Sequence, residues 1–364
     1  MYRLTLAAFV AAILATPSWT GGAQAKEFIL TAIKPDKLVM VDAAARKVAK
    51  TYTIPNATPG VLTITPSPDG KIVYLLINRW ESISGIDLDT GKEVFRADFS
   101  AGDIRTKGMF GVTISPDGKE IFVFQSPVRL LPGEFEVLDT RVAVYNTGDG
   151  IGAKPVRTFP APRRTAILTN SADGTKLYAV NWDITIMDSQ TGKVLGTHKV
   201  RNWGRENHSE PDVLDVWPQW EQASVFSTPY YAVRTDVSMD HPEAFQTGML
   251  TLDLKSGEFV MENFEPTAAI IFSTVVNPVR RNEVYGVYTT LSKIDIETDK
   301  LVNRIDLDHT YYTVNVSGDG KEIYVGGTMD DIAVYDSGTL EKIGEIRMPG
   351  GGDQALASLR VIQR

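Results

Sequence analysis

The chain has 364 residues, of which 43% are hydrophobic and 23% charged, and its formal net charge is −8. This is the composition of a globular protein with a packed core, which excludes disordered and collagen-like chains. An acidic chain without clustered Lys and Arg lacks the surface that binds the phosphates of nucleic acid. The sequence contains no cysteine, which excludes disulfides, thiolate metal sites and thioether-linked haem.

The first 25 residues have the features of a secretory signal peptide. Arg3 gives a positive start, an apolar run follows from Leu4 to Ala15, and Ala23–Ala25 fits the small-x-small cleavage pattern. A membrane anchor is the alternative, but this run would span about 18 Å as a helix, against ~30 Å of hydrocarbon. We therefore predict a cleaved signal peptide over residues 1–25, a periplasmic location, and one folded domain over residues 26–364 with no membrane segment.

A repeated turn motif organises the rest of the chain. An apolar strand precedes a turn built around Asp-Gly, and a second strand follows; Gly accepts the positive φ that a tight hairpin turn needs. A degenerate copy occupies Asn277–Asn282. The full copies are Ser67–Lys71, Ser115–Lys119, Ser171–Gly174 and Ser317–Lys321.

A second motif alternates with the first. It is a β-branched strand that ends in an acidic or amide residue, followed by a short turn and another strand. The usual spacing of these anchors is about 42 residues, which fits four short strands and predicts the blade of a β-propeller. The seven anchors are Asp42, Asp87, Asn146, Asp188, Asp253, Asp295 and Asp336.

The two chain ends complete one blade. The N-terminal part of the domain provides three strands, Phe28–Ala32, Leu38–Val41 and Val48–Ile54, and the C-terminus provides one, Ala355–Ile362. Pairing these strands closes the ring and leaves no open sheet edge. The prediction is an all-β protein: a seven-bladed propeller of four-stranded antiparallel sheets, closed in the first blade by the C-terminal strand.

Departures from the repeat fall on one side of the predicted ring. Antiparallel strands A to D place the A–B and C–D turns on one face, the turn face, and the B–C and D–A connections on the other, the long-loop face. Gln125–Thr140 and Val233–Thr247 lengthen the B–C connections of the third and fifth blades, and Arg201–Pro211 leads into the fifth. Long loops on a rigid scaffold commonly carry binding sites.

Aromatic residues accumulate near the long-loop face. They either wedge between neighbouring blades or form a partner interface or cavity wall. Trp217 and Trp220 fall nearer the turn face and are interpreted as structural. The candidate interface residues are Phe110, Arg129, Phe135, Trp203, Tyr230, Tyr231, Phe272, Tyr311 and Tyr312.

The residues predict no catalytic, cofactor or metal site in this chain. The four histidines, His198, His208, His241 and His309, lack the spacing of metal ligands. The acidic residues near Asp240 lack the alternating oxygen ligands of a calcium loop. No Gly-x-Ser-x-Gly elbow and no Gly-rich phosphate loop occur.

Several longer stretches resemble the β subunit of quinohemoprotein amine dehydrogenase, and the similarity extends through the whole predicted domain. The Ser-Pro-Asp-Gly-Lys turns alone are shared with a broad class of periplasmic propellers, including methylamine dehydrogenase heavy chains and haem d1 proteins. The stretches that carry the resemblance are Pro35–Val39, Ser126–Leu130, Glu210–Leu214, Thr247–Thr251, Phe272–Pro278 and Tyr311–Ser317.

This resemblance implies a periplasmic αβγ enzyme that oxidises primary amines to aldehydes and ammonia. In that family the γ subunit carries cysteine tryptophylquinone, the α subunit carries two c-type haems, and the β propeller carries no cofactor. The chain would then be inactive alone and would help to wall the substrate cavity against the quinone-bearing subunit. A stand-alone propeller enzyme, such as a lactonase-like hydrolase, is the alternative, and it would need a metal near the central channel.

Overall fold

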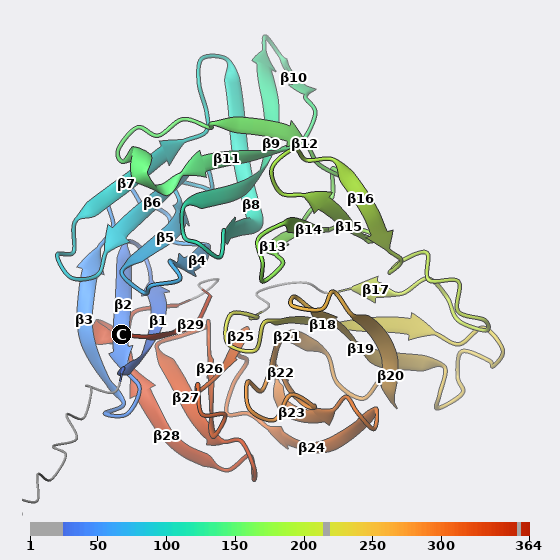
Figure 1. Ribbon diagram of the computed structural model, residues 1–364. Helices are drawn as coiled ribbons and strands as arrows, with labels where there is room; N and C mark the ends of the chain where they lie inside the picture. Colours follow the sequence, from blue (N-terminus) through green and yellow to red (C-terminus); the bar gives the residue numbers. More distant parts are fainter. Residues whose placement is uncertain (1–24, 214–218, 355–357) are drawn as a thin grey trace, which may run out of the picture.

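The computed structural model describes residues 25–213, 219–354 and 358–364. Seven antiparallel sheets are arranged around a central axis (Figure 1), and each contains four strands apart from one additional strand in the third. The predicted seven-bladed propeller is confirmed. Residues 1–24 of the predicted signal peptide lie outside the described residues. Within the described ranges, no helix has the length and apolar character needed to cross a membrane.

In each blade the strands follow chain order from the innermost, near the central axis, to the outermost, except that the last strand of the chain is innermost in blade 1 (Figure 1). Blade 1 contains β29 (Arg360–Gln363), β1 (Glu27–Ile33), β2 (Lys37–Asp42) and β3 (Lys47–Thr53). Blade 2 contains β4 (Thr63–Pro66), β5 (Ile72–Ile77), β6 (Ser82–Asp87) and β7 (Glu93–Asp98). Blade 3 contains β8 (Ile104–Ile114), β9 (Glu120–Leu131), β11 (Arg141–Asn146) and β12 (Arg157–Pro160), with β10 (Glu134–Val137) added to β9. Blade 4 contains β13 (Ile167–Asn170), β14 (Lys176–Val180), β15 (Ile184–Asp188) and β16 (Val194–His198).

The remaining three blades have the same order. Blade 5 contains β17 (Asp212–Val213), β18 (Val225–Val233), β19 (Phe245–Asp253) and β20 (Phe259–Pro266). Blade 6 contains β21 (Ile271–Val276), β22 (Glu283–Tyr288), β23 (Thr290–Asp295) and β24 (Lys300–Asp306). Blade 7 contains β25 (Thr313–Val316), β26 (Glu322–Gly326), β27 (Asp331–Asp336) and β28 (Lys342–Arg347). Two short 3-10 helices, η1 (Thr147–Asp149) and η2 (Pro349–Gly351), lie in connections.

Local hydrogen bonds explain the repeated A–B turn. The Ser67 hydroxyl donates to Asp69 Oδ1 over 2.6 Å and accepts the Ile72 N–H over 3.0 Å. Gly70 has φ 66, which a residue without Cβ adopts freely. The same Ser–Asp bond recurs at Ser115, Ser171 and Ser317.

The C–D anchors fix the second turn of the repeat. Asp87 Oδ1 accepts the backbone N–H of Thr90 at 2.7 Å and of Asp89 at 3.0 Å. These backbone donors, the one at Thr90 foremost, hold the pKa of Asp87 below its usual range. The same bonding recurs at Asp188, Asp253, Asp295 and Asp336. Asn146 differs, because η1 follows it directly.

Blade 1 closes the ring as predicted, but with a shorter final strand. β29 pairs antiparallel with β1, with Leu30 opposite Arg360. The strand begins at Arg360 rather than at the predicted Ala355, because residues 358–359 have no strand pairing and residues 355–357 lie outside the described part of the chain.

The hydrophobic core lies in layers between neighbouring blades. One layer joins Tyr74 and Phe95 of blade 2 to Ile121 and Tyr145 of blade 3, all nearly inaccessible to solvent. The Tyr74 and Phe95 rings meet edge to face with centroids 5.5 Å apart. Large rings therefore fill the wedge-shaped space between sheets that diverge from the axis.

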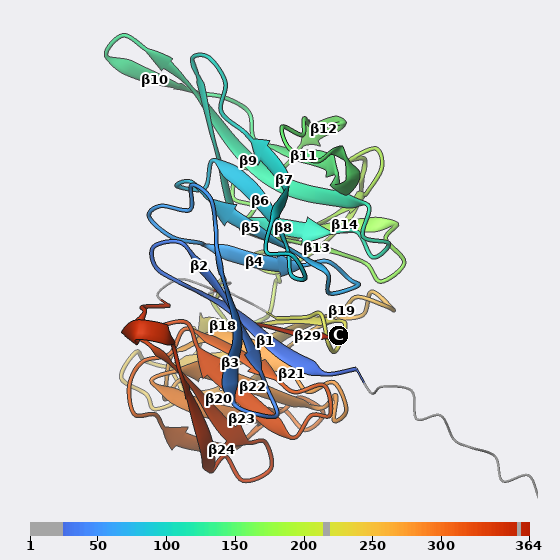
Figure 2. The same ribbon diagram turned by 90° about the vertical axis from the view of Figure 1, so that its left-hand side faces the viewer.

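The insertion in blade 3 is a β-ribbon, so the prediction of a loop over Gln125–Thr140 is wrong. β9 continues to Leu131, turns at Gly133 (φ 83) and returns as β10. An elongated β8 pairs along its other side as far as Ile104 opposite Arg129. Figure 2 shows this ribbon projecting beyond the ring.

The two irregular segments of blade 5 have the predicted positions, and they pack on each other. One leads from β16 to β17, and the other joins β18 to β19. Thr235 N–H donates to the Asn207 carbonyl over 2.9 Å, and Val233 N–H donates to Ser209 Oγ over 3.0 Å. The two segments thus form one layer on the long-loop face.

Candidate functional site

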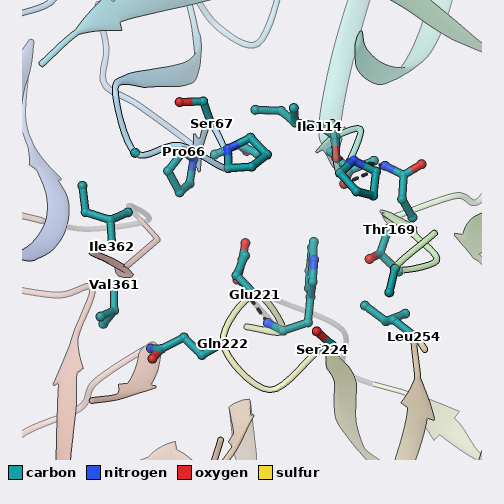
Figure 3. A pocket seen from close by; sticks show the side chains of 18 of the residues that line it. Pro66, Ser67, Ile114, Thr169, Glu221, Gln222, Ser224, Leu254, Val361 and Ile362 are labelled. Carbon is teal, nitrogen blue, oxygen red and sulfur yellow. Dashed lines mark hydrogen bonds between the residues drawn. The ribbon is translucent and has the colours of Figure 1, made fainter. Parts of the chain in front are cut away.

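A wide hollow opens on the turn face, where the central channel ends. It has a volume of about 760 Å³ and is walled by the A–B turns of several blades, with Ser67, Thr169 and Ile362 on its sides (Figure 3). Glu221 is the one charged side chain among the described residues that line it. Among the described residues, its lining therefore provides one carboxylate and no second titratable group beside it.

A buried arginine contacts two of the residues that line this hollow, Glu221 and Trp220. Arg360 is 5% exposed, and its guanidinium donates to the Ile64 carbonyl over 2.8 Å, to Glu221 Oε2 over 3.2 Å and to Gln219 Oε1. Its charge also lies over the Trp220 ring, 5.4 Å from the centroid. Burial lowers the pKa of Arg360, and the Glu221 carboxylate opposes that effect. Trp220 packs on this network and also lines the hollow, so its structural role stays a prediction; Trp217 lies outside the described residues.

No metal-binding group was found among the residues that the structure describes. There, no three His, Asp or Glu side chains lie close enough together to hold an ion. The lactonase-like alternative needs such a group near the channel, and no observation favours it.

The β-ribbon presents two of the predicted interface residues. Phe135 is 72% exposed at its tip. Arg129 is already paired with Glu136 at 2.5 Å and with Asp103 at 3.4 Å. The ribbon therefore offers an exposed ring beside a charge that its own carboxylates neutralise.

Blade 5 places its three predicted aromatics at different depths. Tyr230 is fully buried, and its hydroxyl donates to Asn263 Oδ1 over 2.7 Å. Tyr231 is half-buried and bonds to the backbone of Ile271 in the next blade, and burial raises its pKa to about 12. The half-buried Trp203 meets Tyr230 edge to face at 5.3 Å.

Blades 6 and 7 form an aromatic cluster of Phe272, Tyr288 and Tyr312, all half-buried. Phe272 stacks on Tyr288 with centroids 3.9 Å apart, and Tyr288 stacks on Tyr312 at 6.1 Å. Tyr311 is fully buried instead, where its hydroxyl donates to Asp331 Oδ2 over 2.6 Å. Burial foremost, and then this carboxylate, raise the pKa of Tyr311.

The prediction that Tyr230 and Tyr311 contact a partner is therefore wrong, because both are core residues with no exposed surface. In each Tyr-Tyr pair the side chains alternate, so that one faces the core and the other the surface. Phe110 is half-buried and packs against apolar clusters on both sides of its strand. Tyr288 was missed, because its place beside Phe272 depends on the register of β21 and β22.

Exposed apolar side chains concentrate on the long-loop face. Large exposed residues of the turn face are Ile151, Val156 and Val279, and others lie on the outermost strands. Those of the long-loop face are Met109, Leu130, Leu131, Phe135, Val137, Trp182, Met239, Phe245, Ile270 and Met329.

Comparison of the sequence with protein-family models and with curated proteins finds no match. Among solved structures, the chain is similar to hydrazine synthase of Kuenenia stuttgartiensis, with a TM-score of 0.56 and 16% identity over 86% of this chain and 90% of that one. It is also similar to the dihydro-haem d1 dehydrogenase NirN, with a TM-score of 0.53 and 14% identity over 94% of this chain and 77% of that one. At these identities the likeness shows a shared fold.

Proposed function

We propose that this chain is the non-redox β subunit of a periplasmic quinohemoprotein amine dehydrogenase, which converts primary amines to aldehydes and ammonia. One observation carries the proposal: the ribbon, the blade 5 segments and most exposed apolar loop residues lie on a single face. A scaffold subunit needs such a face, because stable association requires more than about 1,000 Å² of buried surface. The sequence stretches that resemble the family lie partly in these same segments.

The cofactors of the proposed complex belong to its other subunits. Cysteine tryptophylquinone and thioether-linked haem both require thiols, and this chain has none. The dihaem α subunit and the quinone-bearing γ subunit are therefore the expected partners. Both solved propellers of similar fold carry the names of redox enzymes, hydrazine synthase and a dehydrogenase, which supports a role in redox chemistry.

The aromatic cluster is the part of this chain best suited to wall a substrate cavity. Phe272 and Tyr312 come from adjacent blades and keep part of their surface accessible. Aromatic walls exclude water, and electrostatic interactions are stronger in a site without water. The aromatic cluster would then form one wall of a pocket whose reactive group lies on the γ subunit.

Purification of an affinity-tagged chain from its native cells tests the proposal. The tagged chain should bring down a dihaem subunit and a quinone-bearing subunit, both identified by mass spectrometry, and the eluate should reduce an acceptor dye when a primary amine is added. Recovery of the chain alone, or with partners of other chemistry, would contradict the proposal.

A further inference from the structure

A second cavity, of about 390 Å³, lies on the long-loop face between blades 1, 2 and 3. Its lining comes from the B–C turns of blades 1 and 2, the connection between these blades, and β8. Val61 and Leu62 are buried, at 7% and 2% exposure, and they give the cavity an apolar wall. The volume is within the range of pockets that bind small molecules.

Three cations surround this apolar wall. Lys34 is paired with Asp353, whose carboxylate oxygen lies 3.1 Å from its ammonium nitrogen. The described part of the chain provides no ion-pair partner for Arg79 or Lys107, although Lys107 lies 5.4 Å from the centre of the Trp80 ring. Two uncompensated positive charges in one cavity stand out on a protein whose net charge is −8. They create a local attraction for anions.

The backbone holds Arg79 and Trp80 at the cavity in an unusual conformation. Asn78, Arg79 and Trp80 have φ of 53, 54 and 71, the left-handed region that is unfavourable for residues with a Cβ. Hydrogen bonds fix this turn: Trp80 N–H donates to the Ile77 carbonyl over 2.9 Å, and Gly108 N–H donates to the Trp80 carbonyl over 2.7 Å. Strained backbone of this kind is concentrated at binding sites. The turn thus positions a guanidinium beside an indole before any ligand arrives.

We propose that this cavity binds a small aromatic carboxylate. The carboxylate would lie between Arg79 and Lys107, since a guanidinium matches the two oxygens of a carboxylate. The ring would lie against Val61, Leu62 and Trp80. Inorganic anions satisfy the charges but leave the apolar wall unused, so an organic body is part of the proposal. The site is independent of the amine dehydrogenase proposal.

Isothermal titration calorimetry of the purified chain tests this site. Phenylacetate is the probe, phenylacetamide is its neutral counterpart, and inorganic phosphate is an anion without an apolar body. We expect phenylacetate to bind at one site per chain. Phenylacetamide, which loses the charged hydrogen bond, and phosphate, which loses the apolar contact, should each bind at least roughly tenfold more weakly.

Variants assign the binding to the cavity. Arg79→Met and Lys107→Met should each weaken phenylacetate binding roughly tenfold, with little change in melting temperature, because neither side chain forms an ion pair with another described residue. Lys119→Met is the matched control, since this lysine is 80% exposed on the turn face. It should leave the affinity unchanged.

Three outcomes would overturn the proposal. They are equal binding of the amide and the acid, unchanged affinity in both cavity variants, and no heat of binding at millimolar phenylacetate. If phenylacetate fails to bind while Arg79→Met weakens association with partner subunits, the cavity receives an acidic side chain of a partner, and the small-ligand proposal is wrong.

Discussion

Phe28 of the first strand lies opposite Ile362 of the last strand, so residues from the two ends of the domain share one sheet. The Gln363 side-chain amide adds a bond to Glu27 Oε2 over 2.7 Å, and Arg364 N–H donates to the Lys26 carbonyl over 2.9 Å. Without β29, the innermost edge of blade 1 would be unpaired, and the contact of this blade with its neighbours would be weaker.

Truncation of the chain after Leu359 should therefore lower the melting temperature sharply. A milder test is Ile362→Ala, because this side chain is 7% exposed within the core between blades 1 and 2. The free energy of unfolding should fall by about 2–4 kcal/mol. Val302→Ala is the control: at 55% exposure on the outermost strand of blade 6, it should change that free energy by less than about 0.5 kcal/mol. Equal effects of the two substitutions, measured by urea unfolding, would argue against closure through β29.

The pair of Glu120 and Arg157 predicts a dependence of stability on pH. The guanidinium donates to both carboxylate oxygens, over 2.5 and 2.8 Å, and these bonds foremost hold the pKa of Glu120 below its usual range. A carboxyl whose pKa is lower in the folded state stabilises the fold above its unfolded pKa of about 4.3, and this contribution is lost as the pH falls through the folded value.

Glu120→Gln should accordingly lower the free energy of unfolding by about 1–3 kcal/mol at pH 7. The difference from the unsubstituted chain should shrink as the pH falls below about 4.3. Glu134→Gln, on the exposed tip of the ribbon, is the control and should have little effect at any pH. A difference that stays constant from pH 7 to pH 3 would show that the ion pair is not its source.

The repeat was predictable because its information is local. Ser67, Asp69 and Gly70 define a turn within five residues, and their hydrogen bonds involve no distant part of the chain. Strand number, turn positions and closure of the ring follow from counting such turns. The ribbon was not predictable in this way, because Pro127 and Pro132 favour a loop. In the structure, Pro127 is accommodated within β9 opposite Thr106.

The candidate site was less accessible to sequence reasoning, since its geometry depends on register and on distant contacts. The sequence alone does not distinguish Tyr230, which is fully buried, from Tyr231, which is half-buried, because a shift of one residue exchanges the two faces of a strand. The bonds of Arg360 to Gln219 and Ile64 join segments 141 and 296 residues away. No local sequence motif predicts contacts between segments so far apart in the chain.

Arg360→Met should destabilise the fold by about 3 kcal/mol, because removing one member of a buried pair leaves the remaining polar groups unsatisfied. Gln219 Oε1 and the Ile64 carbonyl would each lose the bond from Arg360, while Glu221 is partly accessible to water and is affected less. Arg347→Met provides the comparison: its side chain is 63% exposed, and surface ion pairs contribute about 0–1 kcal/mol. Similar losses in thermal unfolding would mean that the Arg360 network contributes no more than a surface pair.

The purified chain alone should be colourless and inactive towards amines. A thiol is needed both to attach haem covalently and to form the quinone, and the sequence has no cysteine. An absorption spectrum from 350 to 700 nm and an amine-dependent dye-reduction assay measure this directly. The ionic strength is the same in both, at a Debye length of ~10 Å. Visible bands or dye reduction by the chain alone would refute the assignment of the redox chemistry to other subunits.

The ribbon gives the most direct test of the partner face. Reversing the charge of Arg129 would confuse the result, because this residue is paired with Glu136 and Asp103 within the ribbon itself. Phe135→Asp is the better test, because the ring is 72% exposed and its loss removes little of the hydrophobic core.

We expect Phe135→Asp to keep the melting temperature of the isolated chain and to weaken its recovery in the complex, because a charge at an apolar contact must be desolvated on association. Val302→Asp is the matched control, as an exposed apolar residue changed to the same carboxylate on the rim of blade 6. Co-purification from native cells and size-exclusion chromatography measure the assembly. If Phe135→Asp assembles normally while Val279→Asp on the turn face abolishes the complex, the partners bind the opposite face of the ring.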